Sequence, residues 1–155
     1  MASERKYPPH EVLARLESFC AYQERCTFEI SRKLLEWGYA SEEADEFVAS
    51  LQGKGFLDDE RFAESFLSGK FNYKKWGRIK LRYELRARKI GDELVRRVVA
   101  EIDPEVYFSV LTELAVKKWP EIKGKDTWDR KAKLTRFLAA KGYELDLISE
   151  AINQL

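Results

Sequence analysis

The chain has 155 residues, of which 45% are hydrophobic and 35% are charged, and its formal net charge is +1. This apolar content is enough for a core, and the charge is typical of a well-solvated helical surface. The sequence contains no run of 18 apolar residues, so no membrane-spanning helix is predicted. Residues 1–9 lack the apolar centre of a signal peptide. We therefore expect a cytoplasmic protein that does not associate with membranes.

Cys20 and Cys26 are the only cysteines, and His10 is the only histidine. These three residues cannot complete a four-ligand zinc site without carboxylates. In a reducing compartment both thiols stay free, and free cysteines commonly behave as small buried hydrophobic residues. We expect both to be packing residues, and we expect no metal or other cofactor.

Three helices are predicted in the first third of the chain. Apolar residues recur at helical spacing over residues 11–22, after a loose N-terminal tail. A second helix is predicted over residues 27–37, and Gly38 is expected to end it in the left-handed conformation. A third helix continues to Leu51, and Ser41 is the candidate N-cap at its start.

The strongest helix start in the chain is at Asp58. Its carboxylate can accept hydrogen bonds from the first turn of a helix that runs from Asp59 to about residue 71. Leu57 and Phe62 have the spacing of a hydrophobic staple around this cap. The adjacent carboxylates of Asp58 and Asp59 could also suggest metal or acid–base chemistry. Their position directly before an amphipathic helix favours capping.

The next stretch, residues 70–97, is strongly basic. It contains eleven Lys or Arg and three acidic residues, a net charge of +8 in a chain of +1. The eleven candidate binding residues are Lys70, Lys74, Lys75, Arg78, Lys80, Arg82, Arg86, Arg88, Lys89, Arg96 and Arg97. A helix is predicted from Gly77 to Lys89. Four of the basic residues recur at intervals of four and would form one stripe: Lys74, Arg78, Arg82 and Arg86.

Helix signals continue in the last third of the chain. Asp103 is a candidate N-cap, and Pro104 then takes the first helical position. Asp126 or Thr127 can cap the following helix. That helix ends at Lys141-Gly142-Tyr143, which repeats the pattern of Trp37-Gly38-Tyr39.

The helical pattern occurs three times, with offsets of 51 and 53 residues, and aligns without gaps over about 26 residues. Six apolar columns result: Ile30, Leu81 and Leu134; Leu34, Leu85 and Leu138; Tyr39, Ile90 and Tyr143; Ala44, Val95 and Ile148; Val48, Val99 and Ile152; Leu51, Ile102 and Leu155. Lys89 replaces the glycine of the other copies. Either the helix continues there or Lys89 adopts the left-handed conformation.

We predict an all-α fold of three tandem three-helix repeats, stacked into an elongated, curved array. Repeat 1, with the N-terminal tail, covers residues 1–57, repeat 2 covers 58–102, and repeat 3 covers 103–155. Each repeat is too small to bury much surface alone, so neighbouring repeats are expected to pack together. No alternating apolar run predicts a strand.

The basic stretch is the main indication of function. The sequence contains no glycine-rich phosphate loop, no paired-histidine metal motif and no nucleophile beside a base, so we expect no enzyme. Concentrated positive charge attracts phosphates or acidic protein surfaces. Two alternatives remain: the helix is only a solvated face, or it is the recognition helix of a stand-alone DNA-binding module.

Three segments resemble the RecX family of recombination regulators, and together they cover most of residues 11–102. They are GFLDDERFAESF at 55–66, GRIKLRYELRARKI at 77–90 and TFEISRKLLEWGY at 27–39. The third repeat is similar mainly through its repeat pattern.

This resemblance implies tandem three-helix repeats and a binding partner, the RecA recombinase. It implies that the chain lies in the groove of the RecA filament on DNA and inhibits ATP hydrolysis and strand exchange, and with them recombination and the SOS response. The resemblance implies no catalytic residues and no cofactor. We expect the protein to be a monomer. Binding of single- or double-stranded DNA by the basic helix is a further possibility.

Overall fold

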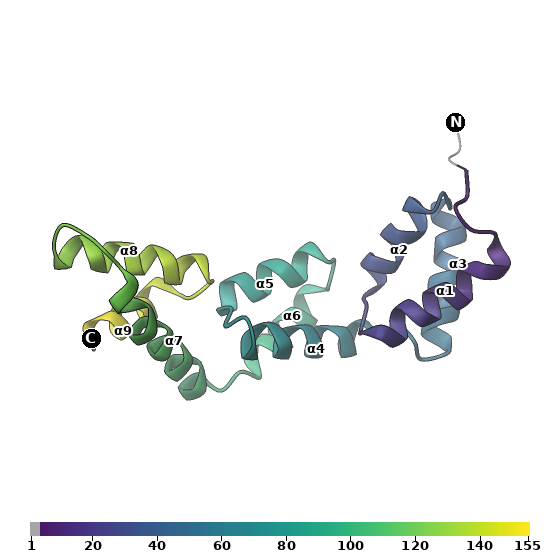
Figure 1. Ribbon diagram of the computed structural model, residues 1–155. Coiled ribbons are helices and arrows are strands. Elements are labelled where there is room, and N and C mark those ends of the chain that lie inside the picture. Colours follow the sequence, from purple (N-terminus) through teal and green to yellow (C-terminus); the bar gives the residue numbers. More distant parts are fainter. Residues whose placement is uncertain (1–3) are drawn as a thin grey trace. The chain divides into compact units, whose positions relative to one another are not determined.

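The computed structural model describes residues 4–155 (Figure 1). Over these residues it contains nine α-helices, one short 3₁₀ helix and no strand, so the predicted all-α fold is confirmed. None of these helices has the length and apolar character that a membrane crossing requires. The elements are α1 (Pro9–Tyr22), α2 (Thr27–Glu36), α3 (Ser41–Gly53), α4 (Asp59–Asn72), α5 (Arg78–Ala87), α6 (Asp92–Ala100), α7 (Pro104–Lys118), η1 (Trp119–Glu121), α8 (Thr127–Ala140) and α9 (Leu145–Asn153).

Aspartate caps begin three of the helices, as predicted. Asp58 Oδ1 accepts from two backbone N–H groups in the first turn of α4, at 3.0 and 3.1 Å. Asp103 does the same for α7, at 2.8 and 3.1 Å. Asp126, rather than Thr127, caps α8 and accepts at 2.7 Å. Each carboxylate satisfies donors that a helix start leaves unpaired.

The predicted serine cap of α3 is wrong. The N-cap is Ala40, and Ser41 is already the first helical residue. Glu43 supplies the polar partner, because its Oε1 accepts from the Ala40 backbone N at 3.2 Å. A glutamate at the third helical position can reach back in this way and satisfy a donor at the cap.

The basic helix α5 is shorter than the predicted span from Gly77 to Lys89. Lys74 and Lys75 lie in the link before it, and Lys75 has a φ of 59°. Lys89 follows the helix with a φ of 60°, so the left-handed alternative at this position is confirmed. Because Lys74 is outside the helix, the predicted stripe of four basic residues along one helix is wrong.

The repeat pattern corresponds to the core. Of the residues in the six aligned columns, every one is buried except Leu155, which is 42% exposed. Cys20 and Cys26 are buried free thiols, as expected. Burial raises the pKa of both thiols, that of Cys26 to about 12. A thiol with so high a pKa is almost entirely protonated at neutral pH, and it is unreactive in that form.

The chain divides into two compact units. One contains residues up to Phe66 together with Arg88–Ile90, and the other contains residues 67–87 and 91–155. Helix α4 is therefore shared between the units. In the first unit α3 packs against α1 and α2, and in the second α5 packs against α6 while α7, α8 and α9 pack against one another.

Candidate partner-binding surface and repeat junctions

The eleven predicted binding residues are spread over three helices and two links. Lys70 lies in α4, and Lys74 and Lys75 follow it. Helix α5 carries Arg78, Lys80, Arg82 and Arg86; Arg88 and Lys89 follow that helix; and Arg96 and Arg97 lie in α6. The side chains of Lys74, Lys75, Arg82 and Lys89 form no ion pair with any residue of the described chain.

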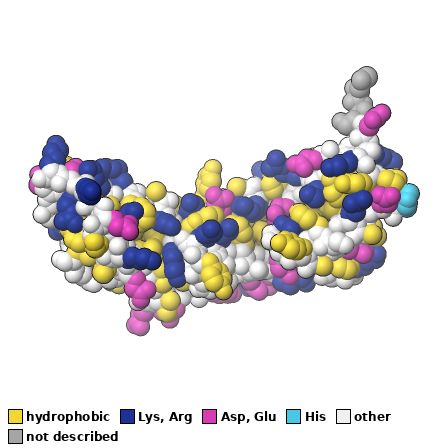
Figure 2. All heavy atoms as spheres, viewed as in Figure 1, with side chains coloured by type: hydrophobic (Ala, Val, Ile, Leu, Met, Phe, Trp, Pro, Cys, Tyr) yellow, Lys and Arg dark blue, Asp and Glu magenta, His cyan; other side chains and the backbone are white. Residues whose placement is uncertain are grey.

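Part of α5 forms a shallow depression with a volume of about 600 Å³. We name its lining the α5 surface; it consists of Ile79, Arg82, Tyr83, Arg86 and Ala87. Ile79 is 51% exposed and Tyr83 is 70% exposed. In Figure 2, dark-blue basic and yellow hydrophobic side chains adjoin over the part of the molecule where Figure 1 labels α5. The surface therefore combines positive charge with exposed apolar area.

Several other predicted residues are held by local contacts. Arg86 Nε lies 3.1 Å from Asp92 Oδ1, in an exposed ion pair of the kind that adds little stability. Lys70 and Lys80 contact the Trp76 ring, with Nζ 5.0 and 4.6 Å from its centroid. These aromatic contacts orient the lysine side chains while their charge still reaches solvent.

Arg78 has a structural role that the sequence did not indicate. Its Nη1 bonds Glu144 Oε2 at 2.9 Å, and its guanidinium lies 3.8 Å from the centroid of the Tyr107 ring. Only 20% of the Arg78 side chain is exposed. Tyr107 also accepts from the Arg78 backbone N at 2.9 Å and donates to Glu144. Arg78 therefore joins the start of α5 to repeat 3.

This network shifts two pKa values. Burial alone would raise the pKa of Glu144, but hydrogen bonds from Tyr107 and Arg78 outweigh it and lower that pKa. Burial, followed by the hydrogen bond to Glu144, raises the pKa of the Tyr107 hydroxyl. The network is thus held together by a carboxylate that stays ionised and a phenol that stays protonated.

The same region brings two backbones together, and we call it the second junction because it joins repeats 2 and 3. Gly77 N donates to Lys141 O at 2.8 Å, and Ile79 N donates to Gly142 O at 3.0 Å. A Cβ atom on Gly77 would lie 2.3 Å from the Gly142 carbonyl carbon. Only a glycine allows so close an approach.

The first junction, between repeats 1 and 2, uses side chains. Asp59 Oδ1 accepts from the backbone N of Thr27 at 2.7 Å and from its Oγ1 at 3.0 Å. Asp59 thus caps α2 of the neighbouring repeat, while Asp58 caps its own helix. The predicted cap at Asp58 is confirmed, whereas Asp59 caps α2 and not the helix that follows it in the sequence. No cluster of metal-ligating residues occurs in residues 4–155.

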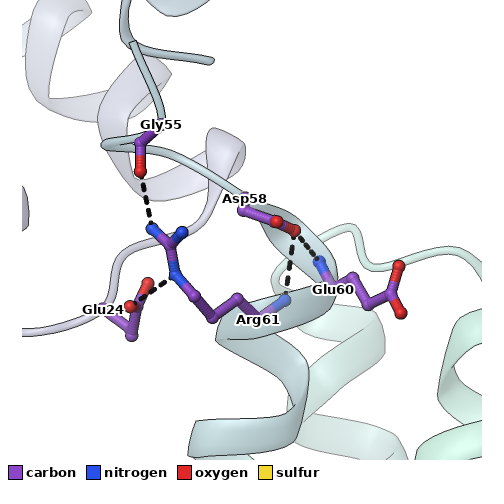
Figure 3. A network of polar contacts seen from close by, with 5 residues as sticks. All are labelled: Glu24, Gly55, Asp58, Glu60 and Arg61. Carbon is purple, nitrogen blue, oxygen red and sulfur yellow. Dashed lines mark hydrogen bonds and ion pairs between the residues drawn. The ribbon is translucent and has the colours of Figure 1, made fainter. Parts of the chain in front are cut away.

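Arg61 adds a second polar contact at the first junction (Figure 3). Its Nε bonds Glu24 Oε1 at 2.6 Å, and its Nη2 donates to Gly55 O at 3.0 Å. Figure 3 shows the guanidinium between these two groups, with Asp58 at the start of the same helix. Sequence analysis missed this contact because Glu24 and Arg61 are 37 residues apart and neither belongs to a local pattern.

These units and junctions define an all-α repeat protein in which consecutive three-helix repeats contact one another. Two family models match the chain: "RecX, second three-helix domain" over residues 58–99 and "RecX, third three-helix domain" over residues 105–152. The chain belongs to the RecX family, as the sequence resemblance implied. The relatives bear the name of a regulatory protein.

Individual relatives extend the similarity to most of the chain. "Regulatory protein RecX" of Chlorobium phaeobacteroides is 32% identical over 127 residues, which are 82% of this chain and 82% of the relative. The protein of the same name from Prosthecochloris aestuarii is 29% identical over 145 residues, 94% of this chain and 93% of the relative.

Solved structures show the same fold. A crystal structure of regulatory protein RecX has a TM-score of 0.82 and 24% identity, and covers 94% of this chain and 71% of the solved one. RecX from Lactobacillus salivarius has a TM-score of 0.80 and 19% identity, with 94% and 95% covered.

Proposed function

We propose that this protein is a negative regulator of the RecA recombinase. It binds the groove of the RecA–DNA filament in the cytoplasm, as a monomer and without catalysis of its own. By occupying the groove it inhibits ATP hydrolysis and strand exchange, and so limits recombination and the SOS response. Membership of the RecX family and the name of its relatives support this partner.

The α5 surface is the observation that carries the proposal. A filament of protein on DNA presents acidic side chains, phosphates and apolar protein surface together. Arg82 supplies a charge that has no acidic partner within residues 4–155, and Ile79 and Tyr83 supply exposed apolar area beside it. Charge on such a surface speeds association, and buried apolar contacts lengthen the life of the complex.

The eleven basic residues of the predicted set do not have equal roles in this proposal. Arg82, Lys74, Lys75 and Lys89 are its principal contact residues, because their side chains have no ion-pair partner in the described chain. Arg78 is excluded as a test position, because its replacement would disrupt the second junction.

Replacement of Arg82 by glutamate tests the function. We expect the variant to inhibit the single-stranded-DNA-dependent ATPase of purified RecA about tenfold less potently, because an attractive charge becomes repulsive. Its thermal stability should change by no more than about 0.5 kcal/mol, because Arg82 is not in the core and forms no ion pair within residues 4–155. The matched control is Arg136→Glu in α8, an exposed arginine outside the predicted set. Undiminished inhibition by Arg82→Glu, or equal loss in both variants, would contradict the proposal.

A stand-alone DNA-binding module is the second candidate, and the link before α5 favours it. Tyr73 is 85% exposed beside Lys74 and Lys75, an arrangement in which a base can stack while the lysines contact phosphate. In that case Tyr73→Ala should weaken binding to free single-stranded DNA by roughly 1–3 kcal/mol. Inhibition of RecA by a variant that no longer binds free DNA would exclude this candidate.

A further inference from the structure

The residues at the end of α8 in repeat 3 form hydrogen bonds with the link before α5 in repeat 2. Lys141 O accepts from Gly77 N at 2.8 Å, and the Tyr143 hydroxyl donates to Lys75 O at 2.8 Å. Gly142 lies between these two residues with a φ of 102°. A carbonyl, a left-handed glycine and a tyrosine hydroxyl therefore form a socket for a non-helical chain segment.

Repeat 1 has the same socket at the aligned positions, and there the N-terminal segment occupies it. Trp37 O accepts from Lys6 N at 2.9 Å, and the Tyr39 hydroxyl donates to Tyr7 O at 2.6 Å. Gly38 lies between them with a φ of 88°, and a Cβ on it would be 2.5 Å from a backbone oxygen of the N-terminal segment. Both hydrogen bonds of the repeat 3 socket thus have a counterpart here, formed by a different segment, and the glycine between them is left-handed in both repeats.

The N-terminal segment is also held by its side chains. Arg5 forms an ion pair with Glu43, and its guanidinium lies 4.7 Å from the Tyr39 ring centroid. The Tyr7 ring packs edge-on against Trp37, with 5.0 Å between their centroids, and Arg15 lies 3.8 Å over the Tyr7 ring. These contacts come from Arg15 in α1, from Glu43 in α3, and from Trp37 and Tyr39 in the link between α2 and α3.

We propose that residues 4–8 are a docking strap that takes the place of a preceding repeat's link. The strap fills the socket of repeat 1 and pairs with polar groups there that would otherwise lack a partner. The socket recognises the backbone of the strap.

The first test uses a chain that lacks residues 1–8 and a fluorescent peptide of those eight residues. We expect the peptide to bind the shortened chain and to bind the full chain at least about tenfold more weakly, because the covalent strap competes at a high effective concentration. The control is a peptide with Lys6 replaced by proline, which has no N–H to donate to Trp37 O. Equal binding of the native peptide to both chains, or to neither, would overturn the proposal.

The second test leaves the chain intact and does not depend on how well the shortened chain folds. Gly38→Ala adds a Cβ against the strap, whereas Gly55→Ala, at a φ of 79°, adds one in open space. Both replacements introduce the same backbone strain. We expect Gly38→Ala alone to speed hydrogen exchange of the Lys6 amide by about tenfold or more. Exchange that is equally slow, or equally fast, in the two variants would show that the socket does not hold the strap.

Discussion

The two junctions join consecutive repeats with different chemical groups. At the second junction backbone meets backbone, and Gly77 N donates directly to Lys141 O. The aligned position at the first junction is Cys26, whose Sγ lies 4.0 Å from Arg88 O. There the carboxylate of Asp59 and the guanidinium of Arg61 form the strong hydrogen bonds instead.

This difference predicts different sensitivities. A junction made by two glycine-containing backbones has no room for a side chain and cannot adjust by changing a rotamer. A junction made by long side chains can adjust, but it depends on charge and on hydrogen bonds that water can replace. Mutations should therefore damage the first junction through polarity, whereas the second junction is sensitive to shape at Gly77 as well as to charge at Glu144.

Gly77→Ala should have the largest effect. The added Cβ would lie 2.3–2.5 Å from three backbone atoms of Gly142 and Tyr143, so no single rotamer change can relieve the overlap. We expect a loss of about 3 kcal/mol in the free energy of unfolding, at the upper end for overpacking. Denaturant unfolding measures it, and Gly69→Ala is the control.

Gly69 lies inside α4 with nothing within 4 Å of an added Cβ. Alanine there should stabilise the helix by roughly 0.5–1 kcal/mol. If the two replacements changed the free energy of unfolding equally, the close backbone contact at Gly77 would not be what makes the second junction sensitive to an added side chain.

Glu144→Gln should have the next largest effect, and it should depend on pH. The pKa of Glu144 is lower in the folded chain than its usual value, so ionisation stabilises the fold above the unfolded pKa of 4.5. This contribution is lost as pH falls through the lower, folded pKa. At neutral pH the neutral glutamine should cost about 2 kcal/mol, because hydrogen bonds to a charged group are lost.

The check is the difference in unfolding free energy between the native chain and Glu144→Gln, measured from pH 7 downward. We expect the difference to stay constant to about pH 5 and then to shrink, because the folded pKa lies below 4.5. A difference that was independent of pH throughout would mean that the Glu144 charge does not stabilise the second junction.

Asp59→Ala should have the smallest effect of the three, and Asp58→Ala is its natural partner for comparison. Asp58→Ala removes a cap within one helix and should cost roughly 1 kcal/mol. Asp59→Ala removes the cap that repeat 2 supplies to α2, and a similar loss is expected.

Hydrogen exchange distinguishes these two carboxylates. Asp59→Ala should expose the Thr27 amide in repeat 1, whereas Asp58→Ala should expose amides in the first turn of α4 only. If Asp59→Ala left Thr27 protected, the first junction would depend on Arg61 and Glu24 rather than on this cap.

Local patterns in the sequence were sufficient for much of the fold. Buried columns recur at helical spacing, and aspartates before amphipathic helices became caps, because these features depend on neighbouring residues. Ser41 is not the cap because α3 begins one residue earlier than predicted, with Ala40 as the N-cap, and Glu43 accepts from the Ala40 N–H.

The site could be predicted less well, since it depends on contacts between distant residues. In the sequence, Arg78 has the four-residue spacing of the other basic residues and so resembles a surface charge. Its structural role comes only from its contacts with Glu144 and Tyr107. Arg82, one turn later on the same helix, has no such neighbour and stays at the surface. A sequence pattern cannot distinguish these two arginines.

Two lysines adopt a backbone conformation that usually belongs to glycine. Lys75 and Lys89, with φ of 59° and 60°, are the non-glycine residues of positive φ within residues 4–155, and both belong to the predicted binding set. A left-handed residue with a side chain gives up about 1–2 kcal/mol of folding stability, which glycine would restore. Replacing either lysine by glycine should therefore stabilise the fold while removing one of the proposed contact residues.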